Sequence, residues 1–198
     1  MKVELAHLQL ETPRLILRPP RLADFDDGWA AFMADEVATK FLGGPQLRPV
    51  AWRNFMCMCG AWHMTGIGMF SVIERATGKW VGRLGPWFPE GWPEREVGWG
   101  IAREHWGKGY AGEGATAAMD YAFGELGWQR VIHCIDPANS ASASVARKLG
   151  SKLLGPVKLP VPFDEATIDA WGQTREEWEQ RGSQRPAHAC DGHAPLQL

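Results

Sequence analysis

The sequence has no long hydrophobic run. None of its 198 residues belongs to a window of about 18 apolar residues, the length that could span a bilayer. The first residues, MKVELAHLQLETPRL, lack the charged and then apolar layout of a secretory signal peptide. We therefore expect a cytoplasmic protein.

Cysteine is scarce. The four cysteines, Cys57, Cys59, Cys134 and Cys190, are too few and too unevenly spaced for a disulfide framework. We expect the first three to be small, buried and reduced. A zinc site built on Cys57, Cys59 and His63 would lack a second pair of ligands, so we predict no metal.

Neither sign of charge dominates. The chain has 21 Lys and Arg against 23 Asp and Glu, a formal net charge of -2. Without a basic surplus, little counterion release is available to drive binding to nucleic acid or to anionic lipid. We therefore expect neither nucleic acid nor a membrane as a partner.

Internal repeats are absent as well, and the length fits one domain. We predict a single domain over residues 1–181. Residues 182–198 are polar, contain proline and have no hydrophobic period, and we expect them to form a flexible tail.

Hydrophobic periodicity divides the domain into strands and helices. It predicts strands at 15–18, 69–74, 80–84, 96–101, 130–135, 152–159 and 166–171. It predicts helices at 24–33, 52–59, 112–126, 140–149 and 174–178. Asp24 is a candidate N-cap for the first helix, and Gly150 is placed to end the fourth. This order predicts an α/β domain with helices packed on a mixed sheet.

Tryptophan is abundant, with eleven residues. We expect most of them in the core. Proline and glycine interrupt the stretch from Gly85 to Pro93, so we predict a loop that holds Trp87 and Trp92 and forms one wall of a binding site. In the strand that follows, Gly98 and Gly100 indicate a bulge or the close approach of a ligand.

A glycine-rich turn, Gly107-Lys-Gly-Tyr-Ala-Gly112, opens the helix predicted at 112–126. Backbone N–H groups in such a turn converge at the positive end of the helix dipole and form an anion site suited to phosphate. The preceding strand ends too early for a dinucleotide fold. A Walker A loop requires Ser or Thr where Gly109 stands. The alternative without a ligand is an ordinary helix-entry turn.

The same turn resembles the pyrophosphate loop of the GNAT (GCN5-related N-acetyltransferase) family. That loop has Arg or Gln, two residues, Gly, one residue, and then Gly or Ala. Gly109 and Ala111 match the pattern. Trp106 replaces the Arg or Gln, as in the branch that includes the ribosomal-protein N-terminal (alanine or serine) acetyltransferases.

The resemblance covers about residues 11–180. Glu11-Thr-Pro-Arg-Leu-Ile-Leu-Arg18 is similar to the first strand of that branch, and Thr174-Arg-Glu-Glu-Trp178 to its closing helix. Asp136-Pro-Ala-Asn139-Ser-Ala-Ser142, with Lys148-Leu-Gly150 behind it, resembles the second cofactor segment. Membership would imply the GNAT fold, a central mixed, mostly antiparallel twisted sheet flanked by helices, and acetyl-CoA as co-substrate.

The resemblance also implies an activity, the transfer of an acetyl group to a primary amine by direct attack on the thioester. The acceptor would be a small molecule or a protein N-terminus, and subunits of this fold often pair, so a homodimer is possible. Another acyl-CoA as donor, or a non-catalytic acyl-CoA-binding module, stays open as an alternative.

Site residues follow from the match to the family. We predict cofactor contacts from Trp99, Gly100, Ile101, Gly107, Lys108, Gly109, Tyr110, Ala111, Gly112, Asn139 and Ser142. Main-chain groups of residues 99–101 would pair with the pantetheine arm, with glycine giving it room. The amide of Asn139 has a second interpretation as a helix N-cap.

Two residues are candidates for catalysis. Glu96 is placed to accept the proton of the amine, through water, and Ser142 to donate a hydrogen bond to the leaving sulfur. Glu90 and Glu94 are the alternatives to Glu96. Many members of the family have a Tyr as general acid where this chain has Ala146.

Overall fold

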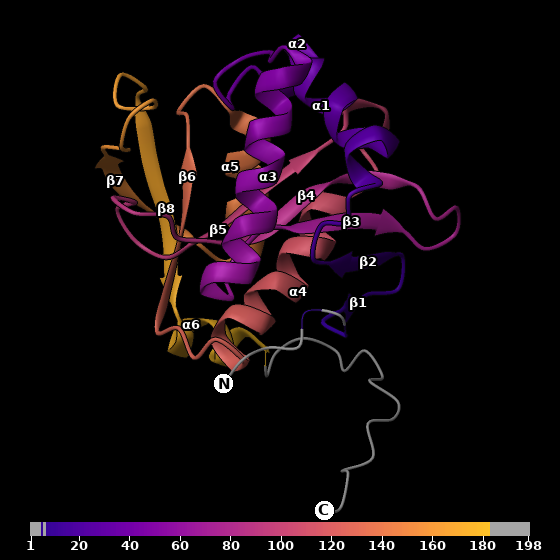
Figure 1. Cartoon of the computed structure of the whole chain (residues 1–198). Helices are drawn as coiled ribbons and strands as arrows, with labels where there is room; N and C mark the ends of the chain where they lie inside the picture. The colour runs from indigo at the N-terminus through magenta and orange to yellow at the C-terminus, as the bar shows by residue number, and fades with distance from the viewer. Residues whose placement is uncertain (1–4, 6, 183–198) are drawn as a thin grey trace, which may run out of the picture.

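The computed structural model describes residue 5 and residues 7–182. Their strands form one eight-stranded sheet in the order β1-β2-β3-β4-β5-β6-β8-β7 (Figure 1). The strands are β1 (Leu10–Glu11), β2 (Leu15–Arg18), β3 (Phe70–Glu74), β4 (Trp80–Trp87), β5 (Glu96–Ile101), β6 (Arg130–Ile135), β7 (Lys152–Val157) and β8 (Ile168–Thr174). Only the β5–β6 pair is parallel among them. The predicted mixed, mostly antiparallel sheet with flanking helices is confirmed.

The helices are α1 (Ala30–Ala34), α2 (Glu36–Thr39), α3 (Arg48–Thr65), α4 (Tyr110–Gly124), α5 (Ser140–Leu149) and α6 (Arg175–Gly182). Helix α4 buries a face of small residues, among them Ala115, Ala118 and Ala122. A Cβ on Gly114 would lie 2.5 Å from Leu84 Cδ2. Small residues therefore let α4 lie directly on β4 and β5, and this contact fixes where the glycine-rich turn at its start lies.

The predicted role of Asp24 as a helix N-cap is wrong. Asp24 does not cap a helix with its side chain. Its buried carboxylate accepts hydrogen bonds from the Arg18 guanidinium at 2.7 and 2.8 Å and from Ser71 Oγ at 2.7 Å. A π-helical turn, Phe25–Trp29, begins there instead and leads into α1. The short elements β1 and α2 have no signal in the sequence that we detected.

The predicted loop at 85–93 begins later than expected, because β4 continues through Gly85 and Pro86 to Trp87. Pro86 is opposite Val97 of β5. Pairing with β3 on the other side has already ended at Phe70 and Leu84. Proline lacks an N–H, and it is tolerated here because no strand lies on that side to accept one.

The predicted bulge in β5 is absent, since β4 and β5 stay in continuous register from Gly82↔Ile101 to Trp87↔Glu96. A Cβ on Gly98 would lie 2.9 Å from Met69 Cε, and one on Gly100 would lie 3.0 Å from Phe32 Cζ. The missing side chains therefore make room for core side chains of the protein.

Helix α6 ends at Gly182, the first residue of the predicted tail. The rest of the predicted tail, 183–198, lies outside the described residues, as does Cys190. In the described part Cys57 is exposed, contrary to the prediction, while Cys59 and Cys134 are partly buried, and all three are free thiols. No helix in this part is long and apolar enough to cross a membrane.

Candidate active site

Strands β5 and β6 are joined at one point only. Their register has a single pair, Glu96↔Ile132, with the N–H of Ile132 donating to the carbonyl of Arg95 at 2.9 Å. Beyond this pair no strand of the described chain pairs with the edge of β5 that faces β6. The sheet therefore has an opening beside residues 97–101.

A histidine bridges the two strands where their backbone pairing stops. His133 of β6 donates from Nδ1 to the carbonyl of Val97 of β5 at 2.7 Å, because a carbonyl can only accept. Its Nε2 then accepts from Ser151 Oγ at 2.9 Å, and this hydroxyl in turn accepts from Gln173 Nε2 at 2.9 Å. Burial lowers the pKa of His133 to about 4, so the ring is neutral at physiological pH.

The open edge of β5 offers a small set of main-chain groups. Groups of successive residues point to alternate sides of a strand. The carbonyls of Val97 and Ile101 turn to the open side, where His133 and Trp106 Nε1 donate to them. Trp99 lies between them, so its N–H and C=O, and the N–H of Ile101, face the opening. Gly100 is opposite Arg83, so its groups turn to β4, which does not favour its predicted contact with the cofactor.

The glycine-rich turn has the features of an anion site. The N–H groups of residues 107–112 have no acceptor among the described residues. Gly107 and Gly109 have φ angles of 75° and 80°, a left-handed conformation that favours glycine. Gly109 precedes the first turn of α4, so the six N–H groups lie at the positive end of a 15-residue helix.

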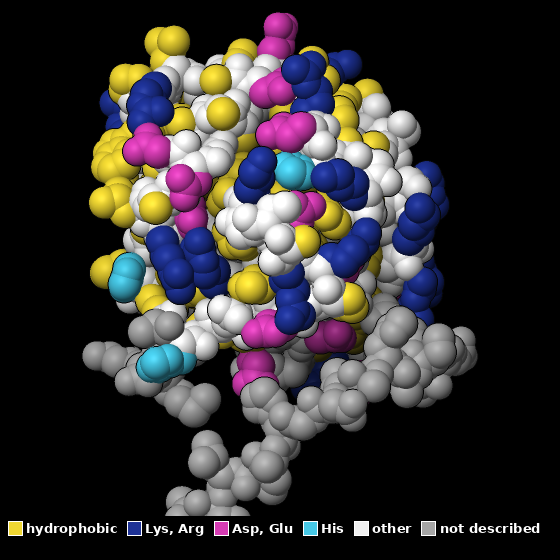
Figure 2. Space-filling model, turned by 90° about the vertical axis from the view of Figure 1, so that its right-hand side faces the viewer, with side chains coloured by type: hydrophobic (Ala, Val, Ile, Leu, Met, Phe, Trp, Pro, Cys, Tyr) yellow, Lys and Arg dark blue, Asp and Glu magenta, His cyan; other side chains and the backbone are white. Residues whose placement is uncertain are grey.

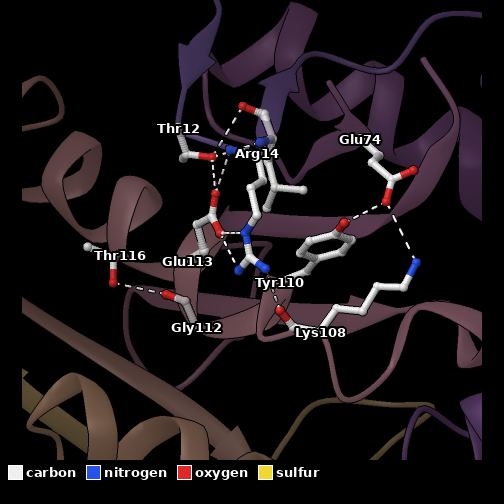
Figure 3. A network of polar contacts seen from close by, with 9 residues as sticks. Thr12, Arg14, Glu74, Lys108, Tyr110, Gly112, Glu113 and Thr116 are labelled. Carbon is white, nitrogen blue, oxygen red and sulfur yellow. Dashed lines mark hydrogen bonds and ion pairs between the residues drawn. The ribbon is translucent and has the colours of Figure 1, made fainter. Parts of the chain in front are cut away.

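An ion pair from the other end of the sequence holds this turn (Figure 3). The Arg14 guanidinium donates to the carbonyl of Lys108 at 2.8 Å and to the Glu113 carboxylate at 2.6 Å. Glu113 also accepts from the N–H of Arg14 and from Thr12 Oγ1. These donors outweigh the effect of burial and lower the pKa of Glu113. The segment before β2 thereby fixes the two ends of the turn.

The charges around the turn are largely balanced. Tyr110 donates to Glu74 at 2.5 Å, and Lys108 Nζ lies 3.7 Å from the same carboxylate and 3.3 Å from His105 Nδ1. Hydrogen bonds from Thr77 and Tyr110 lower the pKa of Glu74 to about 2. Figure 2 shows a face on which Lys and Arg side chains alternate with Asp and Glu. Backbone N–H groups, more than net positive charge, therefore make this turn suited to an anion.

The contacts of Arg14 with Lys108 and Glu113, which we call the Arg14 clamp, give a first prediction. Replacing Arg14 with Ala should weaken CoA binding by about fivefold, roughly 1 kcal/mol, since Arg14 is half exposed but its ion pair belongs to a network. Isothermal calorimetry measures this change. Lys152→Ala, which removes a surface ion pair with Glu177 at the far edge of the sheet, is the matched control. An unchanged dissociation constant in folded Arg14→Ala would mean that the turn keeps its shape without the clamp.

The start of α5 contacts β5 through the side chain of Trp99. Asn139 is an N-cap, as one of its two interpretations predicted, and its Oδ1 accepts from the N–H of Ser142 at 3.0 Å. Trp99 Nε1 lies 3.3 Å from Ser142 Oγ. Two predicted site residues, Trp99 and Ser142, are therefore brought into contact from segments 43 residues apart.

Glu96 is buried at the point where β5 and β6 meet, with 6% of its surface exposed. Its Oε2 accepts from Trp92 Nε1 at 2.6 Å and its Oε1 from the N–H of Cys134 at 3.1 Å. Burial raises the pKa of this carboxyl, although both hydrogen bonds and the charge of Arg83 act in the opposite direction. A carboxylate with a raised pKa is a stronger base, as a proton acceptor requires.

The two tyrosines of the chain offer no general acid in place of Ala146, a buried residue of α5. The hydroxyl of Tyr110 is committed to Glu74. The hydroxyl of Tyr121 is buried without a hydrogen-bond partner among the described residues, in edge-to-face contact with Phe70. No group of three or more His, Cys, Asp or Glu residues in the described ranges could hold a metal ion.

Sequence reasoning missed four residues of this region: Arg14, Arg83, Glu113 and His133. Arg14 and Glu113 are 99 residues apart, and no local pattern links them. His133 had a weak signal, since a single polar side chain interrupts the apolar strand 130–135. Arg83 had a similar signal that we did not use, since it is the one charged residue in the otherwise apolar strand 80–87.

Comparison with known proteins fits this geometry. The sequence profile of the acetyltransferase (GNAT) domain matches residues 14–152. The chain is 39% identical over 87 residues to YkkB of Bacillus subtilis, a match that spans 43% of this chain and 51%, about half, of that protein. It is 31% identical over 144 residues to the uncharacterised N-acetyltransferase YoaA of Bacillus subtilis, covering 71% of this chain and 81% of YoaA.

A solved structure is similar over nearly the whole domain. The acetyltransferase from Agrobacterium tumefaciens superimposes with a TM-score of 0.73 at 32% identity, covering 84% of this chain and 94% of that one. The profile match covers more than half of the chain, and the sheet and helices have the same arrangement. The chain belongs to the GNAT family of acetyltransferases.

Proposed function

We propose that the protein is an acetyl-CoA-dependent N-acetyltransferase that acts on a primary amine. The observation that carries this proposal is the row of six backbone N–H groups at 107–112, which have no acceptor among the described residues and lie at the start of α4. Such a row suits a pyrophosphate. The family supplies the cofactor class, and the opening beside β5 supplies a place for an extended arm.

The pantetheine arm would lie against β5 as an added strand. The C=O of Trp99 and the N–H of Ile101 face this edge and can pair with the arm, which leaves the N–H of Trp99 for the thioester. No backbone group of β6 pairs with these groups, because the two strands pair only at Glu96↔Ile132. The arm would thus take the place of a missing strand partner, with its phosphates at residues 107–112 and its thioester towards Ser142 and Trp99.

The reaction exchanges one bond for another. The amine nitrogen forms a bond to the thioester carbonyl carbon, the carbon–sulfur bond breaks, and the electron pair leaves with sulfur as thiolate. Glu96 accepts the proton that the ammonium must lose, through water. The N–H of Trp99 stabilises the negative charge on the carbonyl oxygen, and Ser142 Oγ donates to the leaving sulfur. A thiol pKa of about 8.5 lets the thiolate leave without a strong acid.

Direct binding of CoA tests the proposal, and Gly109→Val sharpens the test. Calorimetry should show CoA binding to the wild type, and the variant should bind at least about tenfold more weakly, because a side chain would block the phosphate and strain a left-handed residue. Gly127→Val is the matched control, since Gly127 has a φ of 65° and open space around an added Cβ, but lies beyond the other end of α4.

The outcomes separate the alternatives. No heat of binding at about 1 mM CoA would contradict the proposal. An equal loss of CoA affinity in Gly109→Val and Gly127→Val would show that backbone strain, not phosphate contact, is responsible.

A turnover assay separates the remaining alternatives. Thiol release from acetyl-CoA with any amine excludes a pure binding module, and the preference among acyl chains identifies the donor. Whether the amine belongs to a small molecule or to a protein N-terminus, as in the ribosomal-protein branch, follows from the same amine panel.

A further inference from the structure

Arg83 is a partly buried cation with a fully shielded Nε, and the proposed chemistry gives it no role. It is opposite Gly100, so it shares one face of the sheet with Gly98 and Glu96. The adjacent residue, Leu84, points the other way, towards Gly114 of α4. Arg83 therefore extends from the face away from α4, the same face on which the proposed base lies.

The guanidinium makes no hydrogen bond or ion pair to a carboxylate in the described part of the chain. Its Nε is shielded from solvent and has no hydrogen-bond acceptor. Its Nη1 reaches only the sulfur of Met69, at 2.7 Å, and sulfur is a weak acceptor. Burial lowers the pKa of Arg83 to about 10, and the charge of Glu96 acts against this effect. The group is still a cation at neutral pH.

Arg18 is a mostly buried arginine that, unlike Arg83, has a carboxylate partner. It makes two hydrogen bonds to the buried carboxylate of Asp24. Glu96 does not play that part for Arg83, because no hydrogen bond or ion pair joins these two side chains, and Glu96 acts on Arg83 only through its charge. A buried charge without a hydrogen-bonded counter-ion is unfavourable, so its presence indicates a partner that arrives with a ligand.

The surroundings of Arg83 can admit such a ligand. The ring of Trp29 lies 5.6 Å from the guanidinium carbon, and Met69 is the only side chain on its Nη1 within the described residues. Methionine has three rotatable bonds and adapts its conformation easily. Its sulfur can therefore move away from Nη1. On its other side the planar guanidinium offers Nε–H and Nη2–H next to each other, a geometry suited to two oxygens of one anion.

We propose that Arg83 binds an oxyanion of the acceptor, a carboxylate or a phosphate, so that the substrate is an amine that also carries a negative group. This inference rests on the proposed function. The amine would lie at Glu96 and the anion at Arg83, both on the same face of β4 and β5. Arg83 would then decide between acceptors without taking part in the bond exchange.

Calorimetry on the CoA-saturated protein tests the inference without requiring turnover. The probes are two matched pairs, phenylalanine with phenethylamine and phosphoethanolamine with ethanolamine, in which one member has the anion and the other lacks it. The wild type should bind the anionic member of at least one pair about tenfold more tightly or better. The pair that shows the preference identifies carboxylate or phosphate as the group recognised.

Arg83→Gln removes the charge and should abolish this preference to within about twofold, whereas Arg83→Lys should retain part of it. Arg95→Gln is the control, since Arg95 is an exposed cation near the same region and rests on the Phe88 ring. A preference unchanged in Arg83→Gln would overturn the inference, as would failure of both anionic amines to bind the wild type at about 10 mM. CoA binding in the same samples keeps this failure distinct from failure of the proposed function.

Discussion

Glu96→Gln should lower kcat/KM for the amine by at least about 100-fold at pH 7, the usual range for loss of a general base. An alkylammonium has a pKa of about 10.4, so almost none of the substrate is reactive at that pH without a proton acceptor. The raised pKa of Glu96 makes it a better acceptor than an exposed carboxylate. The loss should shrink as the pH rises towards 9, where more free amine is present.

The pH profile carries the test. In the wild type, kcat/KM should decrease when the pH is lowered below the pKa of Glu96. The variant should not show this decrease. Glu90→Gln is the control, since Glu90 is an exposed carboxylate in the neighbouring loop. Thermal unfolding checks the fold, because glutamine has only one oxygen for the two donors that hold Glu96. If both proteins had the same profile from pH 6 to 9, the base would have to be Glu90, Glu94 or water.

The stability of the protein should fall by roughly 3 kcal/mol as the pH drops from 6.5 to 4, owing to His133 alone. In the native state the pKa of His133 is about 4, against 6.5 in the unfolded chain. Between these values the unfolded chain binds a proton that the native state does not. The contribution is therefore complete above pH 6.5 and is lost as the pH falls through this window.

Urea unfolding at a series of pH values measures the slope. His133→Gln should be less stable at pH 7, since it disturbs the bonds to Val97 and Ser151, but its stability should vary less between pH 6.5 and 4. Glu96 contributes with the opposite sign, because its raised pKa favours the native state at low pH, and this term cancels between the two proteins. His63→Gln, on α3, is the control. Parallel curves for wild type and His133→Gln would show that His133 does not titrate in this way.

The sequence predicted an element correctly where residues within that element determine its bounds. Residues 130–135 and 140–149 form β6 and α5 with the predicted bounds, because the apolar period and the glycine at 150 are both local. The interval 85–87 was predicted wrongly, because the tolerance of Pro86 depends on where the neighbouring strand β3 stops. That information lies in the tertiary pairing.

The site shows the same division. The glycine-rich turn could be predicted, since its conformation and its position before α4 follow from neighbouring residues. The burial of Glu96 could not, because it depends on Trp92 and Cys134 closing over one carboxylate. The spaces at Gly98 and Gly100 were assigned to a ligand, but the structure fills them with Met69 and Phe32. A glycine in a strand does not reveal which neighbour approaches it.

The single backbone pair between β5 and β6 also bears on how mutations should accumulate in this protein. If the cofactor completes the sheet, the ligand supplies part of the stability that a closed sheet would obtain from its own hydrogen bonds. Natural selection then acts on the stability of the complex. The free chain can therefore tolerate weaker pairing between β5 and β6 than a protein that must be stable without a ligand. Whether a substitution at residues 97–101 or 131–135 is tolerated should therefore depend on the cofactor concentration in the cell as well as on the stability of the free chain.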